Sequence, residues 1–136
     1  MKILIVLFAV AVCALALPSD DKEEYKKKYR EHINACIEET GTTKEVAEKL
    51  RNGDFSVRDE PAQCFVECFF KRVGFVNEKG EFLSDIIIEK LKKKPELKVE
   101  NLEELIKKCV QEKGANKCET SFKVFECYRS QVTYST

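Results

Sequence analysis

Apolar side chains recur along this chain at helical spacing. Near the start they stand three or four positions apart, which places them on one face of an α-helix, at Tyr25, Tyr29, Ile33, Cys36 and Ile37. Ser19 or Asp20 can cap this helix, and Gly41 can end it. The pattern predicts a first helix from about residue 20 to residue 40, with its cysteine on the inward face.

Five further helices are expected from the same periodicity and from the residues that begin or end helices. They lie at about residues 43–50, 59–73, 84–94, 100–112 and 116–129. Thr42 or Thr43 can cap the second helix, and Asp59 followed by Pro61 marks the start of the third. The expected fold class is all-α.

Serine, proline and glycine residues mark the boundaries of the fourth and fifth helices. Ser84 is expected to cap the fourth helix, which Pro95 ends, and Gly114 is expected to stop the fifth. The three isoleucines at residues 86–88 could also form a strand. Residues 89–94 are good helix formers and no strand partner lies nearby, so a helix is favoured.

The third helix contains two cysteines in the segment CFVEC, at residues 64–68, and this segment is expected to link the third helix to two other parts of the chain. Cys64 and Cys68 are four positions apart, so both point to one side of the helix and cannot comfortably bond to each other. Each must reach a different cysteine elsewhere in the chain. The opposite side, an arc of roughly 140° at 100° per residue, is apolar: Phe65, Val66, Phe69, Phe70 and Val73.

Residues 1–16 have the pattern of a secretory signal peptide. A lysine at position 2 precedes an apolar run that ends at Val12, and Ala14, Leu15 and Ala16 form a small-residue cleavage site. The run is shorter than the roughly 20 residues that span a bilayer. We expect a mature protein of residues 17–136 that is secreted, extracellular and without stable membrane insertion.

Removal of residues 1–16 leaves 23 basic residues, 24 acidic residues and six cysteines. This near-neutral balance argues against nucleic acid as a partner, because nucleic-acid binding usually requires a strong positive charge. Six cysteines in a secreted chain predict three disulfides. A single domain is expected over residues 17–136, with a short C-terminal tail at residues 128–136.

Helix geometry restricts the cysteine pairing without deciding it. Cys118 and Cys127 are nine residues apart on one helix, so they are separated by about 13 Å and point to different sides. Excluding that pair and the Cys64–Cys68 pair leaves ten of the fifteen possible pairings. A local Cys109–Cys118 bond across the Gly114 turn remains among them.

The cysteine spacing Cys36-x27-Cys64-x3-Cys68-x40-Cys109-x8-Cys118-x8-Cys127 lies on predicted helices behind a signal peptide. It resembles the six-cysteine pheromone and general odorant-binding proteins of insects over the whole mature chain. The resemblance implies a compact six-helix domain, stapled by disulfides around an apolar ligand cavity. It also implies the disulfides Cys36–Cys68, Cys64–Cys118 and Cys109–Cys127.

The resemblance further implies a carrier that binds small hydrophobic odorants or pheromone-like molecules and moves them through aqueous lymph to olfactory receptors. Such a carrier is a monomer or weak dimer, needs no cofactor and is not an enzyme. Only nine residues follow Cys127, so the tail can cover the cavity mouth but is too short to replace a ligand. His32 is the one histidine of the chain, so a histidine-driven release of ligand in acid is not expected.

The candidate lining of the cavity combines the apolar side of the third helix with apolar residues of the later helices and tail. Ordinary core packing is the alternative for each member. The candidates are Val66, Phe69, Phe70, Val73, Phe82, Ile87, Leu91, Ile106, Val110, Phe122, Phe125, Val132 and Tyr134.

Other chemistry finds little support in the sequence. His32 and Cys36 have the spacing of half a zinc site, but no second histidine exists and Cys36 is assigned to a disulfide. A hydrolase would need a base and a nucleophile that the chain does not offer. The alternatives to an odorant carrier are a carrier of hydrophobic ligands outside olfaction and a disulfide-rich effector that acts through its surface.

Overall fold

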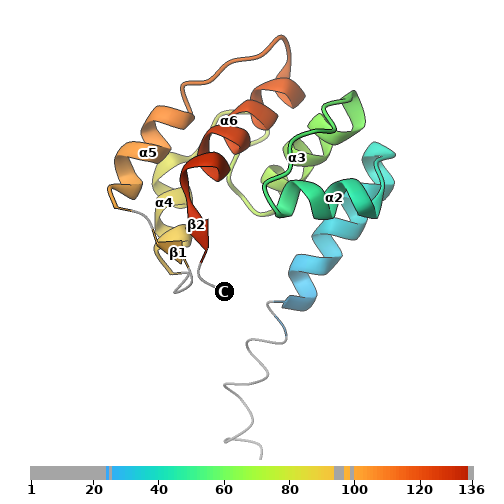
Figure 1. Cartoon of the computed structure of the whole chain (residues 1–136), viewed down its shortest axis with the longest axis horizontal. Coiled ribbons are helices and arrows are strands. Elements are labelled where there is room, and N and C mark those ends of the chain that lie inside the picture. Colours follow the sequence, from blue (N-terminus) through green and yellow to red (C-terminus); the bar gives the residue numbers. More distant parts are fainter. Residues whose placement is uncertain (1–23, 25, 94–96, 99, 135–136) are drawn as a thin grey trace, which may run out of the picture. The chain divides into compact units, whose positions relative to one another are not determined.

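The computed structural model describes residue 24 and residues 26–93, 97–98 and 100–134 of the 136-residue chain (Figure 1). A first helix over residues 26–40 is followed by five more and by two very short strands. The bounds are α2 Lys44–Arg51, α3 Glu60–Arg72, α4 Ser84–Lys92, β1 Leu97–Lys98, α5 Leu102–Cys109, α6 Lys117–Gln131 and β2 Thr133–Tyr134. The all-α prediction is confirmed, including a helix rather than a strand at the three isoleucines.

Three helices begin at a polar residue that caps them, and two of these caps, Thr43 and Asp59, were predicted. The side chains of Thr43, Asp59 and Asn116 accept hydrogen bonds from the backbone N–H groups three residues later, at 3.2, 2.9 and 2.9 Å. Each bond satisfies one of the N–H groups that a helix start leaves unpaired. The first helix ends at Gly41, which adopts a φ of 78° and donates its N–H to the Ile37 carbonyl.

Two predicted boundaries were wrong. Ser84 is the first residue of α4 rather than its cap, and Leu83 holds the cap position. The reason is a backbone bridge between Val76 and Phe82, which keeps the chain extended up to Leu83, whose N–H bonds the Phe75 carbonyl at 2.9 Å.

The fifth helix is also shorter than expected. It ends at Cys109 because the following N–H groups of Gln111 and Glu112 bond carbonyls three residues back, which closes tight turns. Gly114 is therefore not its stop residue. The N–H of Gly114 instead donates to the Thr120 hydroxyl of α6 at 2.9 Å.

Three disulfides connect the helices, and they are the three that the resemblance implied: Cys36–Cys68, Cys64–Cys118 and Cys109–Cys127. The first ties the helix over residues 26–40 to α3, the second ties α3 to α6, and the third ties α5 to α6. The two cysteines of α3 do bond to different partners. The hub role predicted for residues 64–68 is confirmed.

α3 and α6 form the centre of the packing, with α5 against α6, α4 against α5 and α2 against α3. Their facing side chains make one apolar core, in which Phe122 is 1% exposed and Leu50 is 2% exposed. After α6 the chain pairs antiparallel with the segment behind α4, with Leu97 opposite Tyr134 and Lys98 opposite Thr133. This pairing attaches the backbone of the tail to the α4 side of the core (Figure 1).

By compactness the chain divides into residues 1–32 and residues 33–136, and the division falls inside the first helix. The described part of the first unit is helical and holds an ion pair between Lys28 and Glu24 at 3.7 Å. The predicted signal peptide lies outside the described residues, and the single domain over residues 17–136 stays a prediction. Within the described residues, no helix has both the length and the apolar character that crossing a membrane requires.

Candidate ligand-binding site

A chain of aromatic rings crosses the core on the apolar side of α3. Phe70 of α3 lies at its centre, with ring centroids 5.8 Å from Phe75, 6.0 Å from Phe82 and 6.0 Å from Phe125. Two of these contacts are edge-to-face, the arrangement that the charge distribution of aromatic rings favours. Residues from α3, from the turn behind it and from α6 therefore meet on one aromatic surface.

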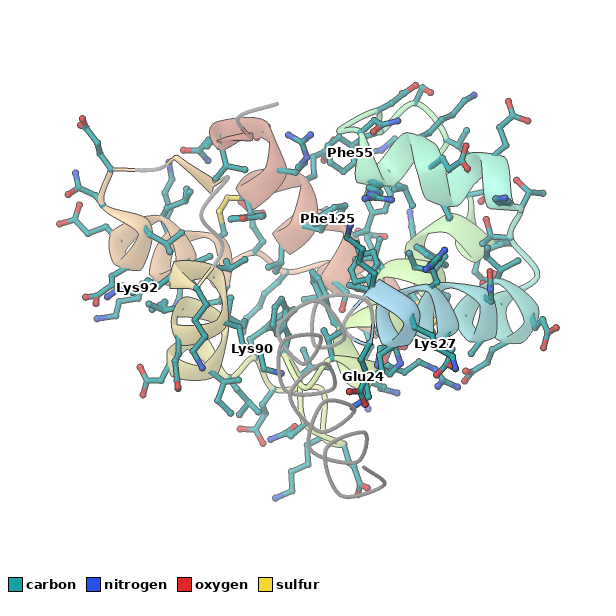
Figure 2. All side chains as sticks on the ribbon, turned by 90° about the horizontal axis from the view of Figure 1, so that it is seen from below. Glu24, Lys27, Phe55, Lys90, Lys92 and Phe125 are labelled. Carbon is teal, nitrogen blue, oxygen red and sulfur yellow. A yellow bond between two sulfur atoms is a disulfide. The ribbon has the colours of Figure 1, made fainter. Side chains whose placement is uncertain are left out.

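Phe55 extends this aromatic cluster from the segment between α2 and α3. Its ring stands edge-on to Phe125 of α6 at 5.6 Å (Figure 2). It also stands edge-on to Phe122 of the same helix at 5.8 Å. Phe55 and Phe125 are only half-buried, whereas Phe122 is 1% exposed. The half-buried rings leave an apolar surface that a ligand can reach.

Residues 54–58, which carry Phe55, are held against α6 by a charged contact. Both outer nitrogens of Arg58 donate to the carboxylate of Glu126, at 2.6 and 3.0 Å. The same guanidinium lies 4.7 Å from the centroid of the Phe122 ring. The hydrogen bonds that Arg58 donates to the Glu126 carboxylate raise the pKa of Arg58 above its ordinary value, so the arginine stays charged at any physiological pH.

A lysine holds the other end of the aromatic cluster. This lysine is Lys90 of α4 (Figure 2). Its ammonium group donates to the carbonyl of Val73, the C-cap of α3, and lies 5.7 Å from the Phe75 ring centroid. A cation at this position satisfies a carbonyl that the helix end leaves unpaired. Lys90 thus fixes the turn that carries Phe75.

The predicted lining residues lie mostly together in the apolar core. Seven are buried: Val66, Phe70, Ile87, Leu91, Ile106, Phe122 and Val132. Four are half-buried and pack on that core: Phe69, Phe82, Val110 and Phe125. Val73 is half-buried, and the side chain of Tyr134 is outside the described part of the structure. Whether each residue contacts a ligand stays a prediction.

Phe55 and Phe75 belong to the aromatic cluster but were absent from the predicted lining. Both lie in connections between helices, where helical periodicity gives no signal. Phe55 and Val57 do alternate with polar residues, and both are half-buried against the core. That alternation is the one sequence feature that could have indicated Phe55 as a buried residue.

A small pocket lies between α3, the turn behind it and the first residues of α6. Its volume is about 260 Å³, and it is partly open to solvent. It combines apolar and polar walls: Glu67, Val76, Gly80, Phe82, Asn116, Lys117, Thr120 and Ser121. Phe82 is the one residue it shares with the predicted lining.

The family of the chain follows from comparison with known proteins. A model described as the PBP/GOBP family, the family of pheromone-binding and general odorant-binding proteins, matches residues 18–131. The chain belongs to this family. The resemblance read from the cysteine spacing is confirmed. PBP/GOBP proteins bind and carry ligands rather than catalyse reactions.

Relatives in this family come from flies and mosquitoes. General odorant-binding protein 56a of Drosophila melanogaster is 34% identical over 112 residues, which are 82% of this chain and 76% of that protein. Odorant-binding protein 10 of Aedes aegypti is 37% identical over 95 residues, or 69% of this chain and 66% of that protein.

Solved structures of the family share the fold. A fatty acid binding protein, OBP56a, from the oral disk of the blowfly Phormia regina superposes with a TM-score of 0.60 at 32% identity, covering 80% of this chain and 92% of that one. Odorant-binding protein 28a of Drosophila melanogaster superposes with a TM-score of 0.62 at 19% identity, covering 80% of this chain and 93% of that one. The second likeness concerns the fold alone.

Proposed function

We propose that this protein is a secreted carrier of small hydrophobic ligands, which it moves through an aqueous fluid to a receptor. The observation that carries the proposal is the family match over residues 18–131. The three disulfides support it physically. They restrict the unfolded chain by roughly 2 to 4 kcal/mol each, which offsets the cost of keeping apolar volume free for a ligand, about 24 cal/mol per Å³.

We propose the aromatic cluster as the ligand-contacting surface. The half-buried rings Phe125 and Phe55 supply apolar area at its edge, and Phe70 packs against Phe125. Phe69 is half-buried on the apolar side of α3. A ligand that buries about 200 Å² of apolar surface on such rings gains about 5 kcal/mol at 25 cal/mol per Å². Association costs consume part of this gain, so dissociation constants in the micromolar range are expected.

Fatty acids are the ligand class that we propose to test first. The blowfly relative at 32% identity is described as a fatty acid binding protein. Two cations lie against the rings of the aromatic cluster, Arg58 over Phe122 and Lys90 near Phe75. An alkyl chain on the rings and a carboxylate near a cation would satisfy both parts of such a ligand.

Displacement of the fluorescent apolar dye N-phenylnaphthylamine tests the carrier function. Oleic and palmitic acids are expected to displace the dye at micromolar concentration, and the matching methyl esters report whether the carboxylate contributes. Failure of the dye to bind at micromolar protein would contradict the carrier function and favour an effector that acts through its surface.

The Phe69→Ala variant tests the position of the ligand. Phe69 is half-buried on the aromatic side of α3, so its loss is expected to weaken dye and fatty acid binding about tenfold, for an aromatic contact of roughly 1.5 kcal/mol. The helical circular dichroism should stay unchanged. Ile86→Ala is the matched control, because Ile86 is 39% exposed on α4. Equal loss of binding and helicity in Phe69→Ala would make Phe69 a core residue instead.

A further inference from the structure

The 260 Å³ pocket has a different chemical character from the aromatic cluster. Glu67 lies three residues after Cys64 and three before Phe70, and Ser121 lies three residues after Cys118 and four before Phe125. By helical spacing both residues therefore lie between the Cys64–Cys118 disulfide and the aromatic cluster. The pocket therefore adjoins the aromatic cluster, and Phe82 is the ring that both share.

The outer wall of the pocket is built by the turn behind α3. The Asn77 side chain accepts the N–H groups of Lys79 and Glu81, both at 3.0 Å, and closes the turn. Gly80 follows with a φ of 84°, a conformation that favours glycine. The methylene groups of Lys117 pass 3.2 to 3.5 Å from the position that a Cβ of Gly80 would take. Lys117 thereby forms a rim whose aliphatic part faces the turn.

Ser121 supplies an unused hydrogen-bonding group on the inner wall. The residue is 3% exposed, and its hydroxyl makes no hydrogen bond to any described residue. An unpaired hydroxyl in a dry interior is costly, yet no fully buried side-chain oxygen or nitrogen of the described residues lacks a partner. The Ser121 oxygen therefore reaches the open space of the pocket, where a ligand oxygen can meet it.

The remaining walls define the ligand by charge and size. Val76, 5% exposed, and Phe82 supply an apolar floor. Lys71 already neutralises the Glu67 carboxylate at 2.9 Å, and water screens the charge of the exposed Lys117, so neither an anion nor a cation is strongly favoured. The volume of about 260 Å³ equals that of roughly nine liquid waters, which matches the size of a short alkyl chain.

We propose that this pocket is a second binding site, for a small neutral amphiphile such as a short-chain alcohol. The alkyl part lies on Val76 and Phe82, and the ligand oxygen exchanges a hydrogen bond with the Ser121 hydroxyl. Thr120 flanks that position, and its hydroxyl proton is free to donate because its oxygen accepts from Gly114.

A titration of the isotope-labelled mature chain with n-hexanol, followed by amide NMR, tests this site. Saturable shifts are expected at Gly80, Lys117, Thr120 and Ser121. Ser121→Ala should weaken the hexanol affinity about five- to tenfold, the effect of one hydrogen bond. Ser130→Ala is the matched control on the same helix, because Ser130 is exposed and its hydroxyl already bonds the Cys127 carbonyl at 3.1 Å.

The results separate this site from the aromatic cluster. Hexanol bound here should leave N-phenylnaphthylamine bound, so this proposal and the carrier function can fail independently. Shifts that grow linearly without saturation, or that centre on the amides of Phe70 and Phe125, would overturn the second site. So would a Ser121→Ala variant with wild-type melting temperature and unchanged hexanol affinity.

Discussion

Replacement of Arg58 by alanine should loosen residues 54–58 from α6. The contact joins Arg58 to Glu126 across 68 positions of sequence through two hydrogen bonds of 2.6 and 3.0 Å, and it is the charged anchor of the segment that carries Phe55. Two hydrogen bonds that involve the backbone of this segment survive the substitution: the Gln63 side chain donates to the Arg58 carbonyl at 3.0 Å, and the Asp54 N–H donates to the Lys49 carbonyl at 2.8 Å.

The size of the effect follows from the exposure of the two side chains. Arg58 is 46% exposed and Glu126 is 34% exposed, so water screens the pair and its energy lies in the surface range of about 0.2 to 1 kcal/mol. The two-pronged geometry favours the upper end of that range. The stacking of Arg58 on the Phe122 ring adds about 0.5 to 1 kcal/mol. Arg58→Ala should therefore lower the free energy of unfolding by about 1.5 to 2 kcal/mol.

A double-mutant cycle separates these two contributions. Glu126→Ala removes only the ion pair and should cost about 1 kcal/mol, and the coupling energy between the two substitutions should be of the same size. The free energies come from urea unfolding followed by circular dichroism with the disulfides intact. High salt should reduce the coupling but not the Phe122 contribution. A coupling energy near zero, or an equal effect of the two single substitutions, would refute this account of the contact.

Three further predictions concern stability and pH. Removing the Cys64–Cys118 disulfide by paired serine substitutions should cost about 4 kcal/mol, because it closes 54 residues; a loss below about 1 kcal/mol in urea unfolding would contradict this. Hydrogen bonds from Ser56 lower the pKa of Asp54, and the bond from Lys92 lowers that of Glu103. Each ionised carboxylate thus stabilises the folded state above about pH 4, and this stabilisation is lost as the pH falls through the lowered pKa values. Asp54→Asn and Glu103→Gln should therefore reduce the pH dependence of the free energy of unfolding only below about pH 4. His32→Ala should leave the pH profile of ligand binding unchanged, and a flattened profile would assign the switch to His32.

Local rules predicted most of the helices because each rule acts within one turn. The caps at Thr43, Asp59 and Asn116 depend on residues three positions away. The boundary at Ser84 failed because a contact between Val76 and Phe82, formed across a turn, extended the chain up to Leu83. A strong local preference for a cap gave way to a tertiary backbone pairing.

The disulfide pairing marks the limit of geometric reasoning from sequence. Helical spacing excluded Cys64–Cys68 and Cys118–Cys127 but left ten pairings. Only the resemblance of the cysteine spacing to a family selected among them. The physical reason is that a disulfide joins helices, and the helix pairs that meet in space are not encoded in the periodicity of any one of them.

The aromatic cluster shows the same limit in the candidate site. Phe69 and Phe70 could be placed on the apolar side of α3 from spacing alone, whereas Phe55 comes from a connecting segment. The position of Phe55 depends on the ion pair that Arg58, three residues later, forms with Glu126 on α6. An ion pair between residues 68 positions apart leaves no local pattern in the sequence. The side chains that close the edge of a binding surface are thus the least predictable, because the distant contacts that hold them are weak and long-range in sequence.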